Sequence, residues 1–140
     1  MSVFVGPCDL INRDSLEVMQ ATCADVLAEI QELWPRFERL VGLRGRKMYA
    51  TADLVAGTYS TCTPIKRGDD PEGLGLGRGH LPAGRFLRGR LHGEPPETYA
   101  RIAPGFDELE ALAGDVDRTR PLVEFYKRHD HIELWLPLAD

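Results

Sequence analysis

One acidic residue stands among apolar and aromatic side chains in the segment Leu122–Tyr126. Glu124 and Tyr126 are two residues apart, so on a β-strand they point to the same face, while Val123 and Phe125 point to the other. A carboxylate beside aromatic rings can pair with a cationic ligand, and the rings add cation–π attraction. Burial raises the pKa of such a carboxyl group, so Glu124 is also a candidate general acid or base. The composition leaves a second interpretation open, in which Glu124 is a solvated residue outside the sheet.

Aromatic residues elsewhere in the chain are candidates for the walls of a site around Glu124, and only a few can line one groove. Tyr49 is the best candidate partner of Tyr126, because an internal repeat described below makes their positions equivalent. Trp34 and Tyr99 lie on the apolar stripes of predicted helices, so we assign them to the core or to the edge of the groove. The candidates are Trp34, Tyr49, Tyr59, Phe86, Tyr99, Tyr126 and Trp135.

The residue sets of several other chemistries are absent from the sequence. Cys8, Cys23 and Cys62 are scattered, which argues against a disulfide framework. His129 and His131 share one face of a strand, but no Cys or carboxylate cluster completes a zinc site, so we expect no metal and no cofactor. There is no Gly-x-Ser-x-Gly nucleophile elbow. Any catalysis is therefore expected to be acid–base work on a ligand that is already reactive.

The composition predicts one globular domain. The 140 residues are 43% hydrophobic and 28% charged, with a net charge of −5. A net acidic chain is a poor partner for nucleic acid, and we interpret the basic cluster Arg78, Arg85, Arg88 and Arg90 as a solvated edge. No apolar run is long enough to cross a membrane, and Met1–Leu10 lacks the pattern of a signal peptide. We therefore expect a cytoplasmic protein without direct membrane or nucleic-acid binding; its oligomeric state stays open.

Two amphipathic helices must position these side chains. The first is predicted to start at a capping box, Thr22–Asp25, and the second to follow Pro95–Pro96. Each contains a proline, Pro35 or Pro104, which removes a backbone donor and is expected to kink or interrupt the helix.

One predicted strand precedes each helix and a predicted hairpin follows it. The glycine-rich segment 68–79 joins the two halves of the chain; it lacks the Lys-Ser/Thr ending of a P-loop, so we interpret it as a flexible crossover. The predicted strands are Leu16–Thr22, Lys47–Thr51, Thr58–Ile65, Arg85–Leu91, Leu122–Lys127 and Ile132–Leu138.

The two halves repeat this order of elements. Pro35 and Pro104 are 69 residues apart (104 − 35), and Phe37 and Phe106 have the same offset. We therefore predict an α+β fold of duplicated βαββ units, half 1 at about 16–65 and half 2 at about 81–138, related by a pseudo-two-fold axis. Its antiparallel sheets would carry both helices on one side, with a groove between the halves for a small molecule. Lys47 takes the position of Glu124 in the first half, so the site would be asymmetric.

The segments Leu81–Gly84, Arg85–Gly93, Pro121–Tyr126 and Leu136–Leu138 resemble the GyrI-like small-molecule-binding domain. This domain also forms the effector-binding half of some multidrug-responsive transcription regulators. The resemblance extends over about Leu16–Leu138 as a single domain and is most specific in the second half. It implies a duplicated βαββ fold and an aromatic groove with one acid at its floor, usually the Glu of the Pro-x-x-Glu-x-Tyr stretch, here Glu124.

The resemblance implies a stand-alone binding protein for a small lipophilic aromatic compound, cationic or neutral, that serves sequestration, resistance or sensing. Met1–Ser15 is too short for the DNA-binding region of the family's regulators, so we do not expect a transcription factor. One alternative is a hydrolase that opens a strained cyclopropane ring of a DNA-alkylating natural product, with Glu124, Tyr126 and the other aromatic residues activating water. A second alternative is a protein-interaction role like that of the family's gyrase-inhibiting member, supported only by the acidic net charge and the acidic second helix.

Overall fold

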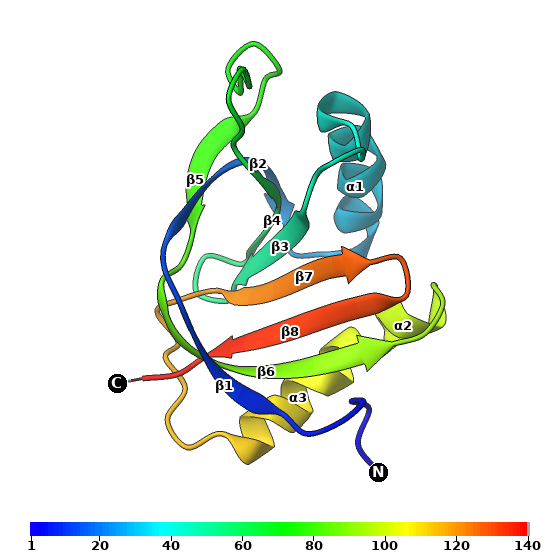
Figure 1. The fold of residues 1–140 in the computed structure, drawn as a ribbon, viewed down its shortest axis with the longest axis vertical. Helices are drawn as coiled ribbons and strands as arrows, with labels where there is room; N and C mark the ends of the chain where they lie inside the picture. Colours follow the sequence, from blue (N-terminus) through cyan, green and yellow to red (C-terminus); the bar gives the residue numbers. More distant parts are fainter. Residues whose placement is uncertain (140) are drawn as a thin grey trace.

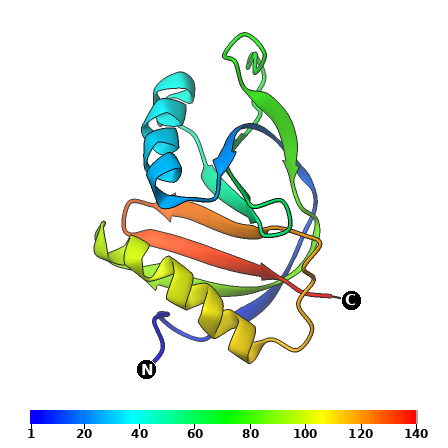
Figure 2. The ribbon, with the colours of Figure 1, turned by 180° about the vertical axis from the view of Figure 1, so that it is seen from behind.

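Eight antiparallel strands form one curled sheet in the computed structural model, which describes residues 1–139 (Figure 1). The helices lie behind this sheet in Figure 1 and in front of it in Figure 2, so they cover the same face. The protein is therefore an α+β fold. In chain order the elements are β1 (Asp9–Arg13), β2 (Leu16–Ala24), α1 (Leu27–Val41), β3 (Met48–Asp53), β4 (Thr58–Pro64), β5 (Gly77–Leu81), β6 (Gly84–His92), α2 (Glu97–Ala100), α3 (Ile102–Leu112), β7 (Leu122–Arg128) and β8 (His131–Pro137).

The middle of the sheet is formed by β3 and β7, which are far apart in the sequence. The strands lie in the order β1-β6-β8-β7-β3-β4-β2-β5, and β3 pairs with β7 in antiparallel fashion. Ala50 lies opposite Glu124, and Met48 lies opposite Tyr126. Because successive side chains of a strand alternate between the two faces, these residues share one face, and Tyr49 points to the other.

The helices bury two separate parts of the face that they cover. Helix α1 forms because its apolar residues recur at helical spacing, and it ends at Gly42, whose φ of 75° favours glycine. Its buried residues Leu33 and Phe37 pack toward β2 and β4, while Phe106 and Leu109 of α3 pack toward β6 and β8. Helix α1 therefore covers one end of the sheet and α3 the other (Figure 2).

The face opposite the helices buries its own apolar cluster. Val18 of β2 and Leu81 of β5 belong to the same cluster as Phe86 of β6, although these strands are far apart in the sheet order. The sheet must therefore curl toward this face, so that distant strands share a core. The buried members of the cluster are Val18, Tyr49, Cys62, Leu81, Phe86, Val123 and Trp135.

The six strands predicted from the sequence are confirmed as β2, β3, β4, β6, β7 and β8. The edge strands β1 and β5 were not predicted. The prediction of a flexible crossover over residues 68–79 is wrong at its end, because residues from Gly77 onward pair with β2 as strand β5 and Leu76 is buried. Backbone pairing with β2 orders this glycine-rich segment, although its side chains carry no strand pattern.

The predicted capping box Thr22–Asp25 is also wrong. Residues 22–24 continue strand β2, and the Thr22 Oγ1 atom lies 2.8 Å from Ser60 Oγ on the neighbouring strand. Helix α1 begins after Val26, which provides no side-chain cap. Pairing with β4 thus holds these residues in the sheet and delays the helix.

The two prolines have different consequences for their helices. Helix α1 continues through Pro35 without interruption. The second predicted helix is divided at Arg101 into α2 and α3, three residues before Pro104. Interruption is therefore seen only near Pro104, which lies in the first turn of α3, where a missing backbone N–H is tolerated.

Candidate functional site

A buried carboxylate, Glu124, lies at the middle of the sheet on the face that the helices cover. Strand β7 places it between Ala50 of β3 and Leu134 of β8, and only 7% of the residue is exposed. The small side chain of Ala50 leaves room above the sheet beside the carboxylate. Aromatic residues from three other elements fill that room.

Two tyrosine hydroxyls hold the carboxylate. The Tyr126 hydroxyl donates to Glu124 Oε1 at 2.6 Å, and the Tyr59 hydroxyl donates to the same oxygen at 3.0 Å. The Trp34 Nε1–H of α1 donates in turn to the Tyr59 hydroxyl at 3.0 Å. This chain of hydrogen bonds connects α1, β4 and β7 and fixes the carboxylate in one orientation.

Further aromatic contacts complete this group of side chains. The ring centroid of Trp34 lies 5.0 Å from that of Tyr126 in an edge-on arrangement, and the Tyr99 ring of α2 lies 6.3 Å from Tyr126 on another side. Tyr99 is 50% exposed and is the most open member. We call Glu124, Tyr126, Tyr59, Trp34 and Tyr99 the Glu124 cluster.

The charge of Glu124 is not compensated within the part of the chain that the structure describes. No Lys or Arg nitrogen of these residues lies within 4.0 Å of the carboxylate. Burial raises the pKa of Glu124 above its ordinary value, although the Tyr126 and Tyr59 hydroxyls act in the opposite direction. Burial, together with the nearby carboxylate, raises the pKa values of both tyrosines. The cluster therefore contains a buried carboxyl group that has no Lys or Arg partner among the described residues.

The remaining predicted site residues lie on the opposite face of the sheet. Tyr49 stacks on Phe125 with ring centroids 4.4 Å apart, and Trp135 lies 5.9 Å from Tyr49 and 5.7 Å from Phe86. The register explains the separation, because Tyr49 pairs with Phe125 and Tyr126 pairs with Met48. The structure therefore brings Glu124, Tyr126, Tyr59, Trp34 and Tyr99 together, and places Tyr49, Phe86 and Trp135 apart from them.

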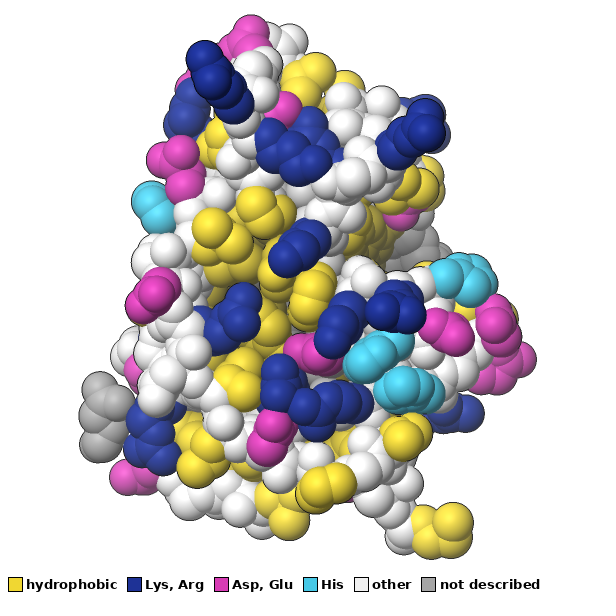
Figure 3. Space-filling model, viewed as in Figure 1, with side chains coloured by type: hydrophobic (Ala, Val, Ile, Leu, Met, Phe, Trp, Pro, Cys, Tyr) yellow, Lys and Arg dark blue, Asp and Glu magenta, His cyan; other side chains and the backbone are white. Residues whose placement is uncertain are grey.

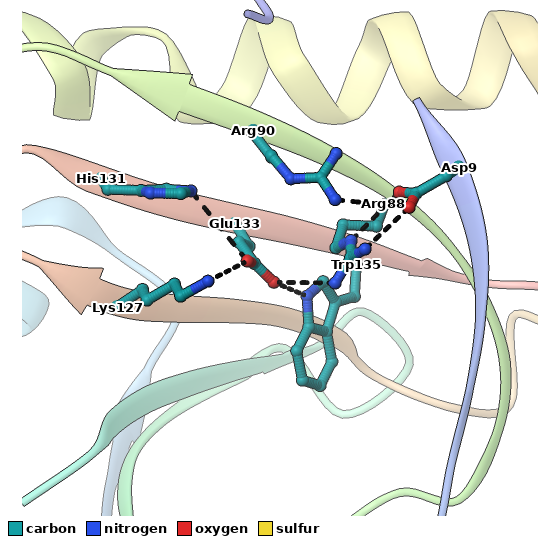
Figure 4. Close-up of polar contacts among 7 residues, drawn as sticks. All are labelled: Asp9, Arg88, Arg90, Lys127, His131, Glu133 and Trp135. Carbon is teal, nitrogen blue, oxygen red and sulfur yellow. Dashed lines mark hydrogen bonds and ion pairs between the residues drawn. The ribbon is translucent and has the colours of Figure 1, made fainter. Parts of the chain in front are cut away.

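A second buried acid, Glu133, was missed by the sequence analysis. It lies on β8 beside Trp135, whose Nε1–H donates to Glu133 Oε1 at 3.0 Å, and only 3% of the residue is exposed (Figure 4). Arg88 at 3.6 Å and Lys127 at 3.7 Å compensate its charge. The spacing of Glu133 and Trp135, an acid and an aromatic residue two apart on a strand, is the same as that of Glu124 and Tyr126 and could have revealed it.

The described residues 1–139 include no group of three or more His, Cys, Asp or Glu side chains placed to hold a metal ion. None of the helices in this range has the length and apolar character needed to span a membrane.

Comparison with known proteins identifies the fold. No protein-family model and no curated protein sequence matches the chain. An integron cassette protein from the mobile metagenome of Vibrio cholerae is similar in structure, with a TM-score of 0.75, 15% sequence identity, and coverage of 94% of this chain and 95% of that one.

Two other solved structures share the architecture. The protein SAV2435, bound to tetraphenylphosphonium, matches with a TM-score of 0.67 and 13% identity over 96% of this chain and 94% of that one. A Listeria innocua protein described as a hydrolase matches with a TM-score of 0.57 and 12% identity over 94% of this chain and 91% of that one. At these identities the similarity shows the fold, which is one that is found in a small-molecule complex.

Proposed function

We propose that this protein is a stand-alone GyrI-like domain that binds a lipophilic aromatic cation at the Glu124 cluster. The observation that carries the proposal is a buried carboxylate that is hydrogen-bonded by two tyrosines, surrounded by aromatic rings and unpaired with any cation of the described chain. The duplication of the βαββ unit, with the pseudo-two-fold axis between β3 and β7, is part of the same proposal. In that arrangement the cluster lies at the junction of the halves.

The energetics of Glu124 favour a cationic ligand. A carboxylate removed from water without a partner is destabilising by several kcal/mol or takes up a proton. A bound cation would supply the missing charge in a region where Coulomb attraction is screened less than in water. The faces of Trp34, Tyr126 and Tyr99 would add cation–π attraction and apolar contact area. The charge of Glu124 and the surrounding aromatic rings thus favour the same class of ligand, a lipophilic aromatic cation.

The structural neighbour that binds tetraphenylphosphonium supports this class of ligand, since that compound is a lipophilic aromatic cation. In the present chain the aromatic side chains themselves fill the cluster. Tyr99, which is half exposed and belongs to the short helix α2, is the side chain that we propose to move aside when the ligand enters.

The test compares two ligands of nearly the same shape and opposite charge, tetraphenylphosphonium and tetraphenylborate, by isothermal titration calorimetry. We expect the protein to bind the phosphonium and not the borate. Glu124→Gln keeps the size of the side chain and should weaken phosphonium binding about 10- to 100-fold, the range for loss of a charge-assisted contact. Glu32→Gln, an exposed change on α1, is the matched control and should leave binding unchanged.

Three results would contradict the proposal. The first is equal binding of the two ions, which would show that shape alone governs affinity. The second is a correctly folded Glu124→Gln protein, judged by circular dichroism, with unchanged phosphonium affinity. The third is the absence of phosphonium binding to the unaltered protein.

A second candidate function is hydrolysis of an electrophilic small molecule. The observation in its favour is the buried Glu124 carboxyl group, whose pKa is raised by burial, as in many general acids and bases. In this case Glu124→Gln would lower turnover more than binding, because the proton moves in the transition state. Incubation with a cyclopropane-bearing alkylating compound, followed by detection of the ring-opened product, distinguishes this function from binding alone.

A further inference from the structure

A cavity opens on the face opposite the helices, away from the Glu124 cluster. Its volume is about 280 Å³, and it lies where β1, β2 and β5 curl over β8. This volume is close to the lower end of the range for small-molecule pockets. We call it the Trp135 cavity; it is lined by Asn12, Arg13, Asp14, Ser15, Leu16, Leu81, Pro82 and Trp135.

The aromatic wall of the cavity is held rigidly. The indole of Trp135 is packed edge-on against Tyr49 and Phe125, each about 5.9 Å away between ring centroids, and tilted against Phe86. Its Nε1–H donates to the buried Glu133 carboxylate (Figure 4). Trp135 is only 3% exposed, so the indole is a fixed and largely buried part of the cavity wall, and its only polar atom is already satisfied by the protein.

The Arg13 side chain packs against this ring. The Arg13 guanidinium carbon lies 4.9 Å from the centroid of Trp135, in cation–π geometry, and the side chain lines the cavity. Among residues 1–139 no carboxylate oxygen lies within 4.0 Å of Arg13. Its charge is thus available to a ligand that enters the cavity.

The neighbouring charges are paired with one another. Arg88 donates to both oxygens of Asp9, at 3.0 and 2.7 Å, and Arg90 lies 3.3 Å from the same carboxylate. Glu133 is compensated by Arg88 and Lys127. Figure 3 shows Lys and Arg side chains gathered around apolar ones on this face. Arg120, which lies over the Phe86 ring, is likewise paired with Asp117. Charged groups on this face thus include the cations Arg13, Arg88, Arg90, Lys127 and Arg120 and the carboxylates Asp9, Asp14, Asp117 and Glu133.

His131 adds no charge that changes this balance. It lies 4.0 Å from Glu133, and burial lowers its pKa, so the imidazole is neutral at neutral pH. Among the charged groups of this face, Arg13 is the cation that lines the cavity and has no carboxylate oxygen within 4.0 Å among residues 1–139. Asp14 is the single carboxylate in the lining and opposes an anion there.

We propose that the Trp135 cavity is a second binding site, which takes a small aromatic anion with its ring against the apolar part of the lining and its acidic group on Arg13. Planar binding of a carboxylate or sulfonate by a guanidinium is the geometry that Arg provides best. Asn12 and Ser15 lie in the same lining and supply further polar groups at the acidic end of the ligand. The site would thus select a charge opposite to that selected at Glu124.

The chain offers a separate reporter for each site, because Trp34 and Trp135 are its only two tryptophans. Their indole N–H signals in a two-dimensional NMR spectrum can be assigned with Trp34→Phe and Trp135→Phe. The probe is 3-phenylpropanoate, and its neutral analogue 3-phenylpropanamide is the control ligand. We expect the anion to shift the Trp135 signal in a saturable way at millimolar concentration, to leave the Trp34 signal in place, and to bind more tightly than the amide.

Three variants and one control variant test which charges the ligand contacts. Arg13→Gln should remove the advantage of the anion over the amide, a loss of about tenfold or more, and Arg13→Lys should recover part of it. Asp14→Asn should strengthen binding of the anion about two- to fivefold, because it removes a like charge from the lining. Arg36→Gln, on α1 at the other face, should have no effect.

Four results would overturn the proposal. They are equal affinities for the anion and the amide, a shift at Trp34 instead of Trp135, an Arg13→Gln protein that binds the anion as well as the Arg36→Gln protein does, and no shift of either signal at millimolar concentration. The outcome is independent of the phosphonium experiment, because the two sites have different reporters, ligands and faces of the sheet.

Discussion

The stability of the unliganded protein should depend on pH through Glu124. Its pKa is raised by burial, so the folded state holds a proton over a pH range in which the unfolded state has released it. The stabilising contribution of the protonated form is complete below the ordinary pKa of a glutamate. It is lost as the pH rises through the raised pKa of the folded state, where an uncompensated carboxylate must form.

Glu124→Gln removes this titration and retains the shape of the side chain. Each unit by which the pKa is raised corresponds to about 1.4 kcal/mol of lost stability at high pH. The two tyrosine hydroxyls at 2.6 and 3.0 Å partly offset the burial. In the variant they bond to a neutral oxygen, and each bond then contributes about 1 kcal/mol instead of about 1.5–3 kcal/mol. We therefore expect the stability of the variant, relative to that of the unaltered protein, to rise as the pH increases from the ordinary pKa of a glutamate through the raised pKa of Glu124 in the folded state.

Urea unfolding of both proteins at several pH values measures this difference. Subtracting the variant's free energy of unfolding cancels the titration of the groups that do not interact with Glu124, including His131. The result that would refute the reasoning is a difference that does not change with pH. It would mean that Glu124 has the same pKa in the folded and unfolded states, and that its burial imposes no need for a cation.

Two further predictions concern the rest of the fold. Gly89→Ala would place its Cβ 2.5 Å from the buried ring of Phe4, so it should destabilise the protein by about 1–3 kcal/mol in urea unfolding, whereas Gly114→Ala, where nothing lies within 4 Å, should be near neutral. Asp69 is bound by both terminal nitrogens of Arg46, at 2.7 Å each, and this contact lowers its pKa to about 2. Asp69→Asn should therefore lower the urea midpoint at neutral pH, and the difference should shrink as the pH falls from the ordinary aspartate pKa to about 2; an equal difference at all pH values would contradict the role of the ion pair.

Much of the secondary structure follows from local patterns in the sequence. Apolar residues at helical spacing predicted α1, and alternating or β-branched segments predicted the six inner strands, because burial of one face imposes these periods. The edge strands β1 and β5 could not be predicted in this way. Residues 77–81, Gly-Arg-Gly-His-Leu, bury only their last side chain, and they form a strand because β2 offers them a free edge.

The candidate site shows the same division between local and long-range information. That Glu124 and Tyr126 share a face was predictable, because side chains alternate on any strand. The contacts of Glu124 with Tyr59 and of Tyr59 with Trp34 depend on the order of the strands and on the position of α1 above them. Neither the strand order nor the position of α1 can be read from residues that are close together in the sequence.

The sequence by itself determined that an acid and several aromatic rings are present and which neighbours on one strand point the same way. Only the tertiary structure decided which rings surround which acid. The register of β3 against β7 sets Tyr49 beside Phe125 and Met48 beside Tyr126, so Tyr49 lies on the face of Glu133 and Trp135 and not on that of Glu124. A shift of one residue in that register would exchange the two faces of β3, and pairing between segments so distant in the chain is selected by the packing of the whole core.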